Sequence, residues 1–175
     1  MVNKSKRLIA LLCTLCMLIG LVPAVSYAAE ATSGTFTDKN GTEFTWSYDT
    51  ETKVLTIGGT GAMTWSGNTH VSGLPWSSFK TEILDVKFES SVTAIGRQLL
   101  SGLTGLTELT IPSNIVTLEW GALEFCTSLK SVEFESGVKV IGDKIFQECT
   151  ALETVVFPET ITSMGNAVFR KTAVT

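Results

Sequence analysis

Residues 152–169 read Leu-Glu-Thr-Val-Val-Phe-Pro-Glu-Thr-Ile-Thr-Ser-Met-Gly-Asn-Ala-Val-Phe, and their apolar pattern occurs three more times at a fixed spacing of 23 residues. The columns hold Ile83, Leu106, Leu129 and Leu152; Val86, Leu109, Val132 and Val155; Phe88, Ile111, Phe134 and Phe157; Val92, Ile115, Val138 and Ile161; and Ile95, Leu118, Ile141 and Met164. An apolar pair closes each unit. Such a period is typical of a solenoid, in which each unit buries its apolar residues against its neighbours. We therefore expect about four repeats, at 83–105, 106–128, 129–151 and 152–175.

The spacing inside a repeat predicts its local structure. Residues 86–88, 109–111 and 132–134 alternate apolar and polar positions, which is the strand period. These strands are predicted to lie side by side in one parallel sheet, ended by Pro112 and Pro158, which have no N–H to donate. Glycines such as Gly142 suit a tight turn or a close approach between coils. Segments such as 143–149 read as one or two helical turns. The predicted fold class is α/β, rich in β structure, with short parallel strands and short helical turns.

The segment before the repeats has a different pattern. Thr35-Phe36-Thr37 and Glu43–Trp46 flank Asn40-Gly41, which is a strong hairpin signal. A second turn at 49–52 leads to another apolar run. A hairpin with a polar outer side would cover the apolar end face of a stack. Residues 29–82 are therefore predicted to form an N-terminal β-hairpin cap and a loop.

The repeat resembles a known family. The unit Leu-x-x-Val-x-Phe-Pro-x-x-Ile-x-x-Met-Gly-x-x-Val-Phe of residues 152–169, and the closing pattern Ile141-Gly142-x-x-Ile145-Phe146-x-x-Cys149, look like the BspA-like leucine-rich repeat of bacterial surface proteins. The run Gly58–Met63 resembles part of that family's cap. The second and fourth repeats depart from the pattern, with Glu119 in place of Gly and Thr172 in place of Cys. The resemblance implies a right-handed leucine-rich-repeat solenoid that acts as an adhesin or interaction module.

Residues 1–28 are typical of a secretory signal peptide. Lys4, Lys6 and Arg7 precede an apolar run of residues 8–22, and small residues around Ala28 suit cleavage. A retained membrane anchor is the alternative, but the apolar run is short for a span. The whole chain has 13 basic and 17 acidic residues, and cleavage would leave 10 basic and 17 acidic residues. An acidic chain without long basic patches is a poor partner for nucleic acid or, after cleavage, for a membrane. We expect a secreted or cell-surface protein.

Cys126 and Cys149 occupy the same repeat column. Neighbouring strands lie about 4.8 Å apart, near the lower end of disulfide Cα separations, so a disulfide is an open alternative. The favoured interpretation is two small buried residues, because Leu103 and Thr172 fill the same column in the other repeats.

Catalytic signals are weak. His70 is the only histidine, and no Gly-x-Ser-x-Gly elbow accompanies it. One histidine and two column cysteines do not make a metal-ligand set. Gly58, Gly59 and Gly61 lack the following Gly-Lys-Ser/Thr of a phosphate loop. The sequence therefore predicts no enzyme, no cofactor and no metal, and no hydrolase activity that depends on His70.

Two sets of residues are candidates for binding a partner. Trp120 stands in a column that otherwise holds the polar residues Arg97, Asp143 and Asn166, which favours a contact residue, with local packing as the alternative. Trp46 and Trp76 are predicted to be structural, whereas Trp65 is ambiguous. The second set is an outward column on the predicted strands, and it consists of Lys87, Thr110, Glu133 and Val156.

The functional prediction is a secreted or cell-surface binding and adhesion module for a protein or glycan ligand. Alternatives are a non-catalytic targeting segment of a larger extracellular enzyme and a self-associating envelope protein. Because no polar cap follows the last repeat in this sequence, we also expect its end face, with Val155, Phe157, Ile161 and Phe169, to be partly exposed and prone to self-association.

Overall fold

The computed structural model describes residues 31–64 and 73–175. Contacts divide the chain into two units, residues 1–31 and 32–175. Only Ala31 of the first unit is among the described residues, so the predicted signal peptide lies outside them, as do Trp65 and His70. All of the strands in the described residues belong to the second unit.

The N-terminal part of this unit is an antiparallel meander of β1 (Ser33–Thr37), β2 (Glu43–Asp49) and β3 (Val54–Gly59). The Asn40-Gly41 signal lies at the first turn, where Gly41 has φ +83° and donates its N–H to the Asp38 carbonyl at 3.1 Å. The Asp38 carboxylate accepts the N–H groups of Asn40 and Thr42, each at 2.9 Å. Alternate residues of β2 are buried, which places one face of the meander against the rest of the unit.

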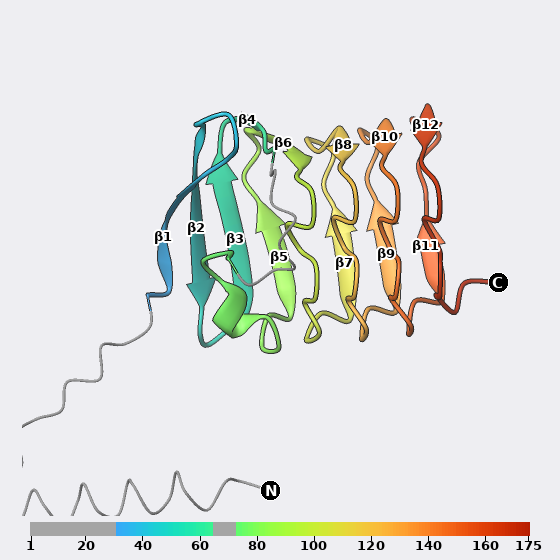
Figure 1. The fold of residues 1–175 in the computed structure, drawn as a ribbon, viewed down its shortest axis with the longest axis horizontal. Helices are drawn as coiled ribbons and strands as arrows, with labels where there is room; N and C mark the ends of the chain where they lie inside the picture. Colours follow the sequence, from blue (N-terminus) through green and yellow to red (C-terminus); the bar gives the residue numbers. More distant parts are fainter. Residues whose placement is uncertain (1–30, 65–72) are drawn as a thin grey trace, which may run out of the picture. The chain divides into compact units, whose positions relative to one another are not determined.

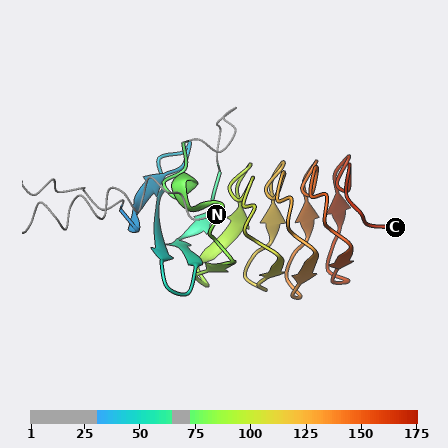
Figure 2. The same ribbon diagram turned by 90° about the horizontal axis from the view of Figure 1, so that it is seen from below.

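The remaining elements form a stack of coils (Figures 1 and 2). We number the coils 1 to 4 after the repeats at 83–105, 106–128, 129–151 and 152–175. The first strands of the coils are β5 (Asp85–Phe88), β7 (Glu108–Ile111), β9 (Ser131–Phe134) and β11 (Thr154–Val156). The second strands are β6 (Val92–Ile95), β8 (Thr117–Leu118), β10 (Val140–Ile141) and β12 (Ser163–Met164). The two remaining elements are β4 (Gly61–Ala62) and a 3-10 turn, η1 (Ser77–Phe79).

Strand pairing between coils is parallel and keeps the repeat register. Leu109 of β7 pairs with Val132 of β9, which pairs with Val155 of β11. The second strands form a continuous sheet in the order β12-β10-β8-β6-β4. Because β3 pairs in parallel with β5, and β4 with β6, residues 54–62 supply the strands that precede coil 1 in both sheets.

The first strands do not form one sheet, which corrects the sequence prediction. β7, β9 and β11 pair with one another, whereas β5 completes the sheet β1-β2-β3-β5. Two local features explain the seam between β5 and β7. The first is that the Asp85 carboxylate accepts the N–H of Val86 at 2.8 Å. The second is Pro112, which occupies the same repeat column as Glu89 and Glu135. Those two residues each donate their N–H to the preceding strand, whereas proline has no N–H to donate.

The segments predicted as helical turns are not helices. In coil 2 the N–H groups of Gly121, Leu123 and Phe125 donate to carbonyls of coil 3 at 2.9–3.1 Å. The residues between them bond within the turn, as Glu124 does to the Gly121 carbonyl at 2.9 Å. Two columns therefore adopt positive φ in every coil, and they contain Gln98, Gly121, Lys144 and Ala167, and Gly102, Phe125, Glu148 and Lys171. A helix would keep its N–H groups for its own carbonyls, and the stack uses half of them to join coils instead.

The predicted apolar columns form the core of coils 1 to 3, in which Phe88 is only partly buried. Coil 4 is more open, with Phe157 and Ile161 half-buried and Met164 46% exposed. Gly142 allows a close approach between coils, because a Cβ there would lie 2.8 Å from the Leu118 carbonyl oxygen. In residues 31–64 and 73–175, no helix has both the length and the apolar character needed to cross a membrane.

Both column cysteines are buried and free, as the favoured interpretation predicted. Each thiol donates to a carbonyl of the preceding coil, from Cys126 to Leu100 at 3.2 Å and from Cys149 to Leu123 at 3.1 Å. Burial raises the pKa of the Cys126 thiol well above its usual value, and the hydrogen bond with Cys149 adds to this effect. Cys126 is therefore a protonated thiol, and both buried cysteines have a structural place in the column.

Candidate functional site

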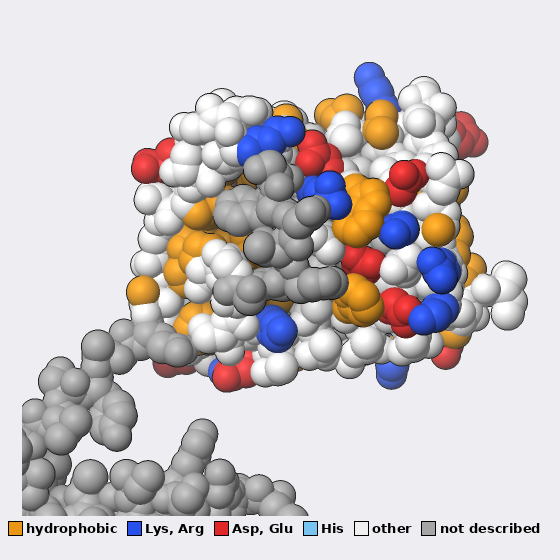
Figure 3. All heavy atoms as spheres, in the orientation of Figure 1, with side chains coloured by type: hydrophobic (Ala, Val, Ile, Leu, Met, Phe, Trp, Pro, Cys, Tyr) orange, Lys and Arg blue, Asp and Glu red, His pale blue; other side chains and the backbone are white. Residues whose placement is uncertain are grey.

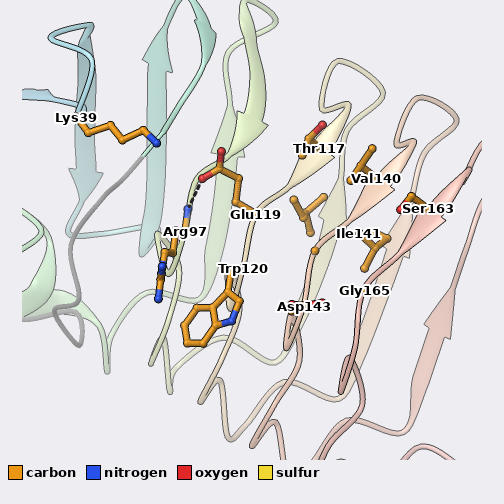
Figure 4. A pocket seen from close by; sticks show the side chains of 12 residues that line it. Lys39, Arg97, Thr117, Glu119, Trp120, Val140, Ile141, Asp143, Ser163 and Gly165 are labelled. Carbon is orange, nitrogen blue, oxygen red and sulfur yellow. Dashed lines mark hydrogen bonds between the residues drawn. The ribbon is translucent and has the colours of Figure 1, made fainter.

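A hollow with a volume of about 620 Å³ lies over the second strands (Figure 4). We call it the Trp120 groove. Its floor contains Thr117, Val140 and Ser163, which are successive copies of one column on β8, β10 and β12. Other lining residues are Arg97, Glu119, Trp120, Asp143 and, from the first hairpin turn, Lys39. The groove therefore crosses several coils and reaches the meander.

Trp120 is half-buried and lies close to two cationic side chains. The Arg97 guanidinium carbon is 4.3 Å from the centre of the Trp120 ring, and the Lys144 ammonium is 4.9 Å from it. Both distances are within the range of cation–π attraction. Arg97 belongs to coil 1 and Lys144 to coil 3. The Trp120 ring of coil 2 therefore contacts a cationic side chain from the coil on each side of it.

The two carboxylates of the groove already accept hydrogen bonds. Glu119 accepts the backbone N–H of Arg97 at 3.2 Å, and Asp143 accepts the backbone N–H of Asn166 at 2.6 Å. Figure 4 shows the first of these bonds as a dashed line. Glu119, which departs from the family pattern, therefore ties coil 2 to coil 1.

Neither carboxylate forms an ion pair with a cation of the groove. Within residues 31–64 and 73–175, the ion pairs are Lys53–Glu82 and Lys171–Glu148, both away from the groove. Arg97 and Lys39 therefore line the groove without a carboxylate partner in the described part of the chain. The surface view shows Lys and Arg side chains near Asp and Glu side chains and hydrophobic side chains on this face (Figure 3).

The outer strand column lies elsewhere. Lys87, Thr110, Glu133 and Val156 are all exposed, as predicted, and Val156 is 54% exposed. The hollow between Thr110, Glu133 and Val156 has a volume of only about 160 Å³. Lys87 lines another hollow, of about 360 Å³, beside the seam between β5 and β7. None of these residues lines the Trp120 groove, so the two predicted sets form separate surfaces.

The structure also places the other candidates. Trp46 and Trp76 are buried and pack together, with ring centres 6.1 Å apart. Among the described residues, no group of three or more His, Cys, Asp and Glu side chains could hold a metal ion. His70 lies outside the described residues, so its predicted lack of a catalytic role stays a prediction.

The sequence pattern indicates Trp120 but not its cationic neighbours. In the sequence, Arg97 stands out only as a polar member of the Trp120 column, and Lys144 occupies the adjacent column. Their proximity could have been read from the 23-residue period. Lys39 could not, because the path of the meander is not repetitive.

Stacked coils of short parallel strands in a 23-residue register are typical of leucine-rich repeat proteins. The sequence model described as "BspA type Leucine rich repeat region (6 copies)" matches residues 77–175. This match covers more than half of the chain, which therefore belongs to the BspA-type leucine-rich repeat family, as the resemblance indicated.

Solved structures agree with this assignment. A leucine-rich repeat protein from Eubacterium ventriosum is 28% identical over 82% of this chain, with a TM-score of 0.64. The T. pallidum leucine-rich repeat protein is 25% identical over 73% of this chain, with a TM-score of 0.51. The chain spans 37% of the first protein and 64% of the second. A search of curated proteins finds no match.

Proposed function

We propose that this chain is a secreted or cell-surface binding module that holds a protein or glycan partner in the Trp120 groove. It would have a signal peptide at 1–28, a cap at 29–82 and a right-handed solenoid of 23-residue repeats at 83–175, and it would have no catalytic activity. The observation that supports this most is a half-buried tryptophan, flanked by cations of the coils on both sides, in an open groove of about 620 Å³. Aromatic and arginine side chains commonly supply most of the energy of such interfaces.

The direct test is an array of glycans and extracellular-matrix proteins probed with the purified protein. Trp120→Ala should abolish binding to the ligands that the unchanged protein retains. Glu133→Ala, on the outer strand column, is the matched control and should leave binding unchanged. Loss of binding in Glu133→Ala but not in Trp120→Ala would show that the binding site is on the outer strand column. Binding that neither variant weakens would contradict both candidate surfaces.

Self-association is a second proposal, and it rests on the exposure of coil 4. Met164 is 46% exposed there, and Val155, Phe157 and Ile161 are only half-buried, whereas their counterparts in coil 3 are buried. Apolar surface of this kind is typical of contact sites. Size-exclusion chromatography at several concentrations should show dimers or larger species, and Met164→Lys should shift them toward monomer. Elution as a monomer at every concentration would exclude the proposal.

A further inference from the structure

Three cationic side chains and two carboxylates lie at the Trp120 groove. Arg97 and Lys39 line it, and Lys144 lies against the ring of Trp120. The carboxylates of Glu119 and Asp143 accept backbone N–H groups of neighbouring coils, which fixes their positions and leaves the cations in excess by one charge. This cationic group stands on a chain with a formal charge of −4. A local positive site on an acidic protein attracts anions selectively, because the rest of the surface repels them.

Arg97 also has an unused donor. Its Nε is buried and has no hydrogen-bond partner among the described residues. A buried donor without a partner costs free energy. The other N–H groups of the Arg97 guanidinium also have no hydrogen-bond partner among the described residues, and these are the donors open to a ligand in the groove. Carboxylate and sulfate oxygens fit the fork of a guanidinium group particularly well. The missing partner of Arg97 is therefore best supplied by an acidic group.

The floor of the groove distinguishes a saccharide from a peptide. Below it β8 and β10 are paired on both sides, and β12 is paired with β10, so the floor itself has no free strand edge for a peptide backbone. The unpaired edge of β12 faces the end of the stack and not the groove. The floor presents the side chains of Thr117 and Ser163 instead. Their hydroxyl groups both donate and accept hydrogen bonds, as sugar hydroxyls require.

Trp120 would act on such a ligand through the cations. Its ring holds Arg97 at 4.3 Å and Lys144 at 4.9 Å. Because these two cations lie beside it, the ring is less available for stacking on a neutral sugar. Its contacts also fix the positions of the Arg97 and Lys144 side chains. Such preorganisation lowers the entropy that binding must overcome.

We propose that the Trp120 groove binds an acidic saccharide, with Arg97 as the residue that contacts its carboxylate or sulfate group. This inference rests on the proposed function, because it names the class of ligand for the same groove. Carboxylated and sulfated sugars share the chemistry that the groove recognises, and a titration with one polysaccharide of each kind distinguishes them.

The experiment is a binding titration of the purified protein by biolayer interferometry. The probes are polygalacturonate (carboxylated), heparin (sulfated), dextran (neutral) and poly-L-glutamate (an anionic peptide). At least one acidic polysaccharide should bind, dextran should not, and poly-L-glutamate should bind at least about tenfold more weakly. Raising NaCl from about 50 to about 500 mM should weaken binding by at least about tenfold, because salt screens the cations. Whichever of polygalacturonate and heparin binds more tightly shows whether the groove prefers a carboxylate or a sulfate group.

Arg97→Gln should weaken binding to that polysaccharide by about tenfold or more, since it removes a charge-assisted hydrogen bond. Lys87→Gln removes the same charge from the outer strands and should have no effect. Equal effects of the two variants, or equal binding of dextran or poly-L-glutamate, would overturn the inference. If ligands lost in Trp120→Ala are neutral glycans or proteins, the proposed function stands and this inference fails. If no ligand depends on Trp120, both fail.

Discussion

Gly102 offers the sharpest test of the hydrogen-bonded ladder that joins the turns. Its φ is +74°, its N–H donates to the Glu124 carbonyl at 2.8 Å, and a Cβ added to it would meet no atom within 4 Å. Gly102→Ala therefore adds no clash, and its cost comes from the backbone conformation. A left-handed conformation costs an L-residue about 1–2 kcal/mol, and alanine offsets about 0.4–1 kcal/mol by restricting the unfolded chain. We expect a net loss of about 1 kcal/mol.

The measurement is guanidinium denaturation followed by circular dichroism, with a thermal melt beside it. A loss of about 1 kcal/mol corresponds to a decrease in Tm of about 2–4 °C for a chain of this length. Gly73→Ala is the matched control, because Gly73 also has open space around its Cβ position but does not have positive φ. It should be neutral or slightly stabilising. Equal effects of the two substitutions would refute the left-handed ladder.

Three further predictions address the core, the first turn of the meander and the cysteines. Phe146→Ala should cost about 3–5 kcal/mol in denaturant melts, because the ring is fully buried, whereas Lys87→Ala should stay within about 0.5 kcal/mol; similar losses would refute the register. Burial tends to raise the pKa of Asp38, but hydrogen bonds from Thr64 and nearby backbone N–H groups lower it to about 2, below the ordinary value of 3.8. Ionised Asp38 therefore stabilises the fold above about pH 4, and this contribution to the free energy of unfolding should be lost as the pH falls toward 2. The Asp38→Asn variant has no such carboxylate, so its free energy of unfolding should change less over this pH range. Cys126 and Cys149 should resist a thiol reagent in the folded protein and react after denaturation; fast reaction in the folded protein would contradict their burial.

The sequence predicted the parts of the fold that depend on its period. Buried residues such as Leu129 and Ile141 each belong to a column of apolar residues spaced 23 residues apart, and hydrophobic burial acts on each repeat in the same way. The left-handed turns could not be read from the sequence, because Phe125 and Glu148 share that conformation and share no chemical feature that favours it. Hydrogen bonds between coils impose it on whichever residue stands there.

The seam and the groove show a different limit. The seam depends on Pro112 and on the Asp85 carboxylate, which accepts the Val86 N–H within its own strand. A repeat pattern does not reveal such a local bond. The groove depends on Lys39, which the meander brings near coil 2 from about 80 residues away in sequence. Aperiodic contacts of this kind follow only from the folded structure.

The seam between β5 and β7 divides the mechanical behaviour of the stack. On that side no β-ladder joins coil 1 to coil 2, while on the other side β6 pairs with β8 and the turns are bonded coil to coil. A bending force should therefore open the molecule along β5 and β7, with the β6–β8 side as the hinge. The outer strand column would change its spacing at Lys87 and Thr110 under such a load. The Trp120 groove lies over the hinge side and would keep its geometry. A ligand bound there would therefore stay bound while the stack bends.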